Sequence, residues 1–170
     1  GSNWGIEGGT VSISVWVNIT SDPNSDDTFA ATCDGGTDVC YYLMYRAAPS
    51  NRLVFNRHRW GTADGAAEYV VDLPINQSYV HVVGTYDGAY TKLYVNGVLQ
   101  GLGEYSGTGS GASSNTYLIR NLQVGTVWYR GFLDEVGVWD RNLTQTEITQ
   151  LYNGGAGITY SDGPTDNNPV

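Results

Sequence analysis

Basic residues and long apolar runs are what this sequence has least of. Its 170 residues include 8 Lys and Arg against 17 Asp and Glu, which gives a formal net charge of -9. Because phosphate binding needs a basic surface, this balance argues against nucleic acid and anionic membranes as partners, and it suits neutral ligands and bound calcium. No stretch of about 18 apolar residues occurs, so we expect no insertion into a membrane.

Cysteine is almost as scarce, with Cys33 and Cys40 the two that occur, in the stretch CDGGTDVC. A usual zinc site needs about four ligands, so this spacing does not resemble one. A disulfide across so short a loop is the prediction, and it would indicate an oxidising, extracellular compartment. The alternative is a pair of reduced cysteines without consequence.

Glycine, threonine, serine, asparagine and tyrosine are plentiful, which suits many short strands joined by turns. Val11, Ile13, Val15, Val17 and Ile19 alternate with polar residues and Trp16, so they predict a half-buried strand. Further strands are expected at 29–32, 41–45, 53–60, 68–71, 79–86, 91–95, 98–100, 116–120 and 123–127, with a loop over 101–115.

Asn96-Gly97 is the strongest two-residue signal for a hairpin in the chain. Together these patterns predict an all-β fold, a two-sheet antiparallel β-sandwich with one short C-terminal helix. We expect one domain over residues 1–160 and a polar tail or linker over 161–170. The chain opens without a signal peptide, and we interpret it as a mature or trimmed piece.

The sequence contains signals for both ends of the expected helix. Thr144 and Glu147 form a T-x-x-E capping box, and Leu143 and Ile148 are placed as its hydrophobic staple. Two glycines at 154 and 155 stand where a helix ends and a positive φ is needed.

The strand before this helix gives the best lead to chemistry. Phe132, Val136 and Val138 share one phase of a period-two alternation, so that face should point into the core, and Asp134 shares the phase. A buried carboxylate is costly unless it is paired, hydrogen-bonded or bound to a metal. Asp134 is therefore the predicted ligand of a structural Ca²⁺, since hard oxygen ligands suit that ion. The alternative is an aspartate bonded to backbone amides or to an arginine.

Three segments follow in an order that resembles a known family: VSISVWVNI, YVHVVGTYDGAYTKLYVNGVLQG and GFLDEVGVWDRNLTQTEITQLYNGG. They are similar to the laminin-G-like, concanavalin-A-like jelly-roll domains of bacterial, archaeal and viral surface proteins, over about residues 6–155. The resemblance implies two packed antiparallel sheets and, in many members, sugar binding. It also implies a structural calcium held by an aspartate like Asp134 and by carbonyls near the start of the domain. Members usually open with an extra strand, whereas this chain begins almost directly at the second.

Catalysis is not expected. Glycanases of this type place two carboxylates a few ångströms apart, and no two of the five glutamates are spaced to lie side by side on one strand. Asp134 and Glu135 are adjacent and should point to opposite faces. His58 and His81 have no recognisable nucleophile partner.

Aromatic and arginine side chains near strand ends are the candidates for ligand contact, because sugar faces stack on exposed rings. The predicted ligand-binding residues are Trp60, Arg57, Arg59, Tyr41, Tyr42 and Trp128. The alternative for each ring is packing against the sandwich, which is our expectation for Trp16 and Trp139.

The sequence therefore predicts a non-catalytic, extracellular module within a larger secreted or surface protein. Because the chain is acidic, the glycan that it binds is expected to be neutral. The alternative is a structural or adhesive surface or filament subunit. Such a subunit would be completed by strand exchange, with self-association through the chain ends, because an open sheet edge can accept a strand from a neighbour.

Overall fold

The fold comes from a computed structural model, in which the described residues are 10–20, 27–33, 40–46, 51–58, 65–70, 78–104, 115–118 and 129–158. Side chains at 32, 33, 58 and 115–118 are not part of that description. Within these ranges, no helix is long and apolar enough to cross a membrane.

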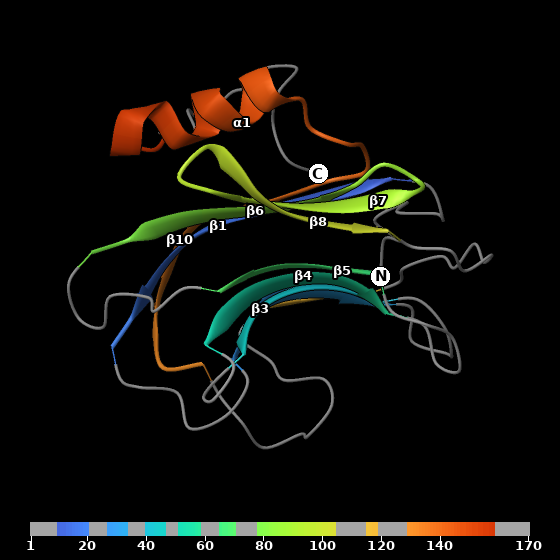
Figure 1. The fold of residues 1–170 in the computed structure, drawn as a ribbon. Helices are drawn as coiled ribbons and strands as arrows, with labels where there is room; N and C mark the ends of the chain where they lie inside the picture. Colours follow the sequence, from blue (N-terminus) through green and yellow to red (C-terminus); the bar gives the residue numbers. More distant parts are fainter. Residues whose placement is uncertain are drawn as a thin grey trace.

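The described strands form two antiparallel five-stranded sheets that pack face to face, which confirms the predicted sandwich (Figure 1). The first sheet has the order β10 (Gly131–Trp139), β1 (Val11–Ile19), β6 (Val80–Tyr86), β7 (Tyr90–Val95), β8 (Val98–Glu104). The second has the order β5 (Gly65–Val70), β4 (Arg52–His58), β3 (Cys40–Arg46), β2 (Asp27–Cys33), β9 (Asn115–Leu118). Helix α1 (Gln145–Tyr152) lies on the outer face of the first sheet and continues into the 3-10 turn η1 (Asn153–Gly155).

Alternate residues of both sheets meet in the main core, as period-two patterns require. Its members include Val11, Ile13, Val15, Val17, Phe29, Tyr41, Leu43, Leu53, Phe55, Val82 and Leu93. Burying one such aliphatic or aromatic side chain contributes about 1.5–3 kcal/mol, so this layer supplies most of the driving force for folding.

A second apolar cluster lies under helix α1 on the outer face of the first sheet. It consists of Val83, Tyr94, Trp139, Leu143 and Ile148. Strand β1 is consequently buried on both faces, whereas its alternation predicted a half-buried strand. The polar phase of β1 is satisfied locally, because Ser12 donates to the Arg141 carbonyl at 2.8 Å and accepts from the Leu143 amide at 2.9 Å.

The local signals of the helix are confirmed. The Thr144–Glu147 capping box is present in both directions, and Leu143 and Ile148 pack in the same buried cluster. The helix ends at Asn153, which is left-handed with a φ of 47°, and Gly154 follows with a φ of 63°.

The predicted hairpin is also confirmed, with left-handed φ values of 49° at Asn96 and 79° at Gly97. Strand β8 continues to Glu104, so the expectation of a loop from residue 101 was wrong for its first four residues. Glycine at 101 serves packing, because a Cβ there would lie 2.6 Å from the Glu68 carbonyl oxygen of β5.

Strand β10 departs from its predicted phase at a β-bulge. Glu135 adopts a left-handed φ of 47°, and the pairing with β1 shifts between Ser14 and Trp16. An extra residue inverts the alternation. Leu133 and Val136 therefore pack against the main core, while Phe132 is 60% exposed and Asp134 is exposed. The prediction that Phe132 and Asp134 point inward was wrong, because alternation alone cannot reveal a bulge.

Candidate functional site

The predicted ligand residues that the structure describes are divided between two faces of the second sheet. Arg57 and Tyr41 are both 1% exposed, and the Arg57 guanidinium lies 6.0 Å from the Tyr41 ring centre and 5.1 Å from that of Tyr86. Tyr42 lies on the opposite face, where its hydroxyl accepts from the Asn56 side chain at 2.7 Å. All three predicted residues are buried, so in this structure they do not form a shared exposed platform.

Other predicted positions lie outside the described residues. Trp60, Arg59 and Trp128 belong to this group, so their contact with a ligand stays a prediction. Cys33 and Cys40 stand directly opposite each other in the pairing of β2 with β3. The Cys33 side chain is not described, and the disulfide also stays a prediction.

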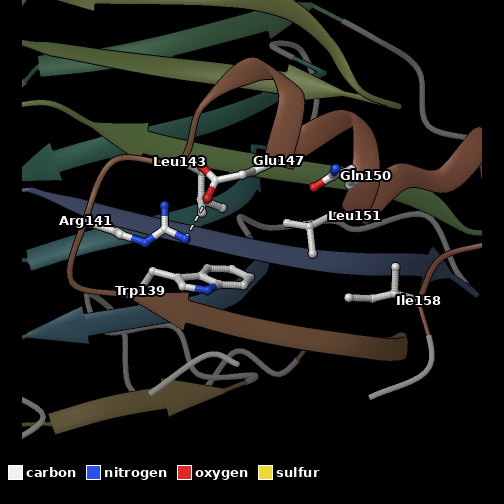
Figure 2. A pocket seen from close by; sticks show the side chains of 7 residues that line it. All are labelled: Trp139, Arg141, Leu143, Glu147, Gln150, Leu151 and Ile158. Carbon is white, nitrogen blue, oxygen red and sulfur yellow. Dashed lines mark ion pairs between the residues drawn. The ribbon is translucent and has the colours of Figure 1, made fainter. Parts of the chain in front are cut away.

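A pocket of about 230 Å3 opens between α1 and the end of β10. We call it the helix pocket, and Figure 2 shows its lining: Trp139, Arg141, Leu143, Glu147, Gln150, Leu151 and Ile158. Leu151 from the helix and Ile158 from the segment after it face the same space as Trp139. The floor of the pocket is apolar, and its polar groups come from Arg141, Glu147 and Gln150.

The two charged side chains of the helix pocket form an ion pair. The Arg141 Nη2 lies 2.7 Å from Glu147 Oε1, while Glu147 Oε2 accepts from the Thr144 amide at 2.8 Å. The hydrogen bond from Arg141, followed by those from Thr144, lowers the pKa of Glu147 to about 2. The same bond raises the pKa of Arg141. Both side chains therefore stay ionised, and their charges cancel.

A smaller pocket of about 150 Å3 lies on the same outer face and is lined by Trp16, Tyr79, Asp134, Glu135, Gly155 and Ala156. We call it the carboxylate pocket. The bulge at Glu135 brings both carboxylates to its wall, which corrects the prediction that they point to opposite faces. Asp134 Oδ1 accepts from the Glu135 amide at 2.8 Å, and Glu135 Oε2 accepts from the Ile158 amide at 2.9 Å.

The carboxylate pocket meets part of the requirement for calcium. Ca²⁺ takes about 6–8 oxygen ligands, and the two carboxylates supply oxygens of the right chemistry. Among the described residues, no group of three His, Cys, Asp or Glu side chains could hold a metal. The segment near the start of the domain, from which further carbonyls were expected, lies outside the described residues. Calcium at Asp134 stays a prediction, and it no longer rests on burial.

Sequence reasoning missed a serine–histidine contact between β1 and β6. Ser14 Oγ lies 2.9 Å from His81 Nε2, and burial lowers the pKa of His81 to about 4. The histidine is 1% exposed, and its Nδ1 has no hydrogen-bond partner among the described residues. A catalytic serine–histidine pair needs access for substrate, and the burial of His81 denies that access to this pair. The His81 ring instead packs at a tilt against Trp16, at a ring-centre distance of 5.0 Å, and stacks on Tyr152 at 6.1 Å.

Sequence reasoning also missed the helix pocket. Glu147 was assigned only to the capping box, and Arg141 and Gln150 carried no signal of their own. A helix-face pattern does contain Gln150 and Leu151 near Glu147, but only the packing of α1 onto β10 brings them to Trp139. Trp16 and Trp139 are packed against the sandwich as expected, at 7% and 4% exposure.

Comparisons with known proteins agree with this architecture. Residues 2–149 match the family model described as "Concanavalin A-like lectin/glucanases superfamily". No curated protein matches the chain.

Three solved structures with similar folds are distant in sequence. The binding domain of botulinum neurotoxin serotype G has a TM-score of 0.62 at 16% identity, over 87% of this chain and 36% of that one. The receptor binding domain of the C/D mosaic serotype has a TM-score of 0.64 at 14% identity, over 86% and 36%. The heptameric SAP-like pentraxin of Limulus polyphemus has a TM-score of 0.62 at 14% identity, over 86% and 72%. The chain thus spans about a third of the neurotoxin domains, and these likenesses establish the fold alone.

Proposed function

Because this chain belongs to the concanavalin A-like lectin/glucanase superfamily, we propose that it is a non-catalytic module that binds a glycan. The family match over residues 2–149 is the observation that carries the proposal. Similar folds occur in the binding domains of neurotoxins, which supports a binding role over a catalytic one. The buried Ser14–His81 pair supports the same choice, since a substrate cannot reach it.

The partner we propose is a neutral glycan. A chain with a net charge of -9 repels polyanions, and this disfavours nucleic acid and sulfated sugars. Screening on a glycan array, with and without a chelator, tests the proposal most directly. We expect binding to a restricted set of neutral glycans. Binding to none of them, together with polymers in size-exclusion chromatography, would contradict the module and favour a filament subunit.

We place the module outside the cell, as part of a secreted or surface protein. The opposed positions of Cys33 and Cys40 on neighbouring strands support a disulfide there, because such bonds persist in oxidising compartments. The intact mass of unreduced protein should be two hydrogens lower than that of the reduced protein. Two thiols that react with a labelling reagent without reduction would contradict the bond.

We also propose that Asp134 holds a structural Ca²⁺. The support is its exposed carboxylate beside that of Glu135 in one small pocket. Bound there, the ion would supply charge neutralisation for the two carboxylates and a link to the segment that contains Gly155 and Ala156. Elemental analysis of protein purified in calcium should find the metal in wild type and not in Asp134→Asn.

A further inference from the structure

The helix pocket has the size and the lining of a site for one sugar ring. We propose that it is the glycan site of this module, and that it holds a single neutral pyranose; the proposal rests on the glycan-binding function proposed above. None of its lining residues was among the ligand residues predicted from sequence. It would make the outer face of the first sheet, beside α1, the binding face.

The volume of the helix pocket limits the size of the ligand that it can hold. Pockets for drug-sized ligands measure about 300–1,000 Å3. At about 230 Å3, the helix pocket lies just below that range, so it suits one ring and leaves the rest of a longer glycan in solvent. A terminal sugar, or one sugar that projects from a chain, fits this geometry.

The charges favour a neutral occupant. Arg141 and Glu147 are bonded to each other at 2.7 Å, so an anion would meet the carboxylate and a cation would meet the guanidinium. A hydroxyl group avoids both costs, because it donates to Glu147 and accepts from Arg141 at once. The side-chain amide of Gln150, on the exposed surface of the helix, can either donate or accept a hydrogen bond.

The apolar lining favours a sugar over a purely polar solute. Trp139, Leu143, Leu151 and Ile158 present carbon atoms to the same space. The C–H face of a pyranose can cover such a surface while its hydroxyls reach the polar groups, as in other sites that combine both kinds of lining. Glycine at 137 supports this arrangement, because a Cβ there would collide with the Trp139 ring and displace it.

The pocket is held in shape before a ligand arrives. Glu147 is fixed by Thr144 and Arg141, and Leu143 and Trp139 belong to the buried cluster under α1. Ile158 is tied to β10, because its amide donates to Glu135 at 2.9 Å. Preorganised groups lose little conformational entropy on binding, and this matters for a ligand as small as one sugar.

Titration with a panel of methyl glycosides tests the proposal. The panel comprises methyl glucoside, galactoside, mannoside and N-acetylglucosaminide, with methyl glucuronide as the anionic comparison. The readout is the chemical shift of the Gln150 side-chain amide and of the Arg141 Nε–H by nuclear magnetic resonance, on the full chain. We expect saturable shifts at both groups with at least one neutral glycoside and weaker binding of the glucuronide.

Two variants and two matched controls sharpen the test. Gln150→Ala should weaken binding about fivefold, and Arg141→Met about tenfold or more, as expected for loss of a neutral and a charge-assisted hydrogen bond. Arg130→Met removes an exposed arginine outside the pocket, and Thr146→Ala removes an exposed helical side chain outside it. Both controls should keep the affinity of wild type. All four positions are at least partly exposed, so the fold should survive.

The outcomes separate the two proposals. If the glycan array finds a ligand and the Gln150 and Arg141 variants bind it as wild type does, the glycan function stands and the site lies elsewhere. If neither the array nor the panel binds, both proposals fail. Equal or tighter binding of the glucuronide would overturn the neutral-sugar assignment while leaving a ligand in the pocket.

Discussion

The helix pocket and the carboxylate pocket share one face of the first sheet, but their charges are arranged in opposite ways. In the helix pocket, Glu147 is paired with Arg141. In the carboxylate pocket, Asp134 and Glu135 stand together, and none of the described lining residues is basic. The first arrangement is neutral and suits hydroxyl groups, while the second has net negative charge and suits a cation.

The two pockets are also connected through the chain. The segment after α1 contributes Gly155 and Ala156 to the carboxylate pocket and Ile158 to the helix pocket. Glu135 joins them through the Ile158 amide, and its carboxylate occupies the space that a side chain at 157 would need. Gly157 has a φ of 68°, so glycine suits that position for both reasons. Neutralising the carboxylates should therefore shift Ile158 in the wall of the helix pocket.

The largest effect should come from removing the floor of the helix pocket. Trp139→Ala should lower the free energy of unfolding by about 3–5 kcal/mol, because it deletes a buried indole from the cluster under α1. Phe132→Ala, on the same strand beyond the bulge, should cost less than about 0.5 kcal/mol, since that ring is exposed. Urea unfolding of both variants measures the contrast. If both variants lost similar amounts of unfolding free energy, Phe132 would be buried and the bulge at Glu135 would be placed wrongly.

The buried His81, whose ring contacts those of Trp16 and Tyr152, should make the fold sensitive to acid. His81 has a folded-state pKa of about 4, below its ordinary value of 6.5, because burial penalises the charged form. Stability should be complete above pH 6.5 and decline as the pH falls toward 4, by up to about 3 kcal/mol. The difference in unfolding free energy between wild type and His81→Gln measures this contribution. A difference that does not vary from pH 7 to 4 would contradict it.

Calcium should act on one pocket and not on the other. A ligand that binds only the folded state stabilises it by about 2.7 kcal/mol at a hundredfold excess over its Kd. Chelation should therefore lower the melting temperature of wild type, and Asp134→Asn should abolish that response. Arg141→Met should respond to chelator as wild type does. If chelator leaves the wild-type melting curve unchanged and elemental analysis finds no metal, the carboxylate pocket does not bind calcium.

The elements that the sequence predicted well are those with local causes. The capping box of Thr144 and Glu147 and the Asn96-Gly97 turn each depend on neighbouring residues, so a short window contains the whole signal. The core of β1 was likewise predicted from alternation. What alternation could not show is that α1 covers the other face of that strand.

The site was harder to predict because it depends on two non-local events. The bulge at Glu135 reverses the phase of β10, and no residue type at 135 announces a left-handed φ. The packing of α1 then brings Arg141 and Gln150 beside Trp139. Arg57 illustrates the converse, since its place beside Trp60 near a strand end suggested ligand contact, whereas its guanidinium is buried between two tyrosine rings.

The smallest effect should come from neutralising one charge of the helix pocket. Glu147→Gln should cost about 1 kcal/mol of unfolding free energy, because it weakens a helix cap and a partly exposed ion pair that solvent screens. The folded pKa of Glu147 is about 2, below its ordinary value of 4.5. Its contribution should therefore be present above pH 4.5 and lost as the pH falls toward 2.

A double-mutant cycle with Arg141→Met separates the ion pair from the cap. The two substitutions should be non-additive, since both remove the same 2.7 Å contact, whereas Thr144→Ala isolates the capping part. In glycoside titrations, Glu147→Gln should release the guanidinium and improve binding of the glucuronide relative to neutral sugars. If the preference for neutral sugars is unchanged in Glu147→Gln, the paired charges do not set the specificity of the helix pocket, and the contrast with the carboxylate pocket has no bearing on ligand choice.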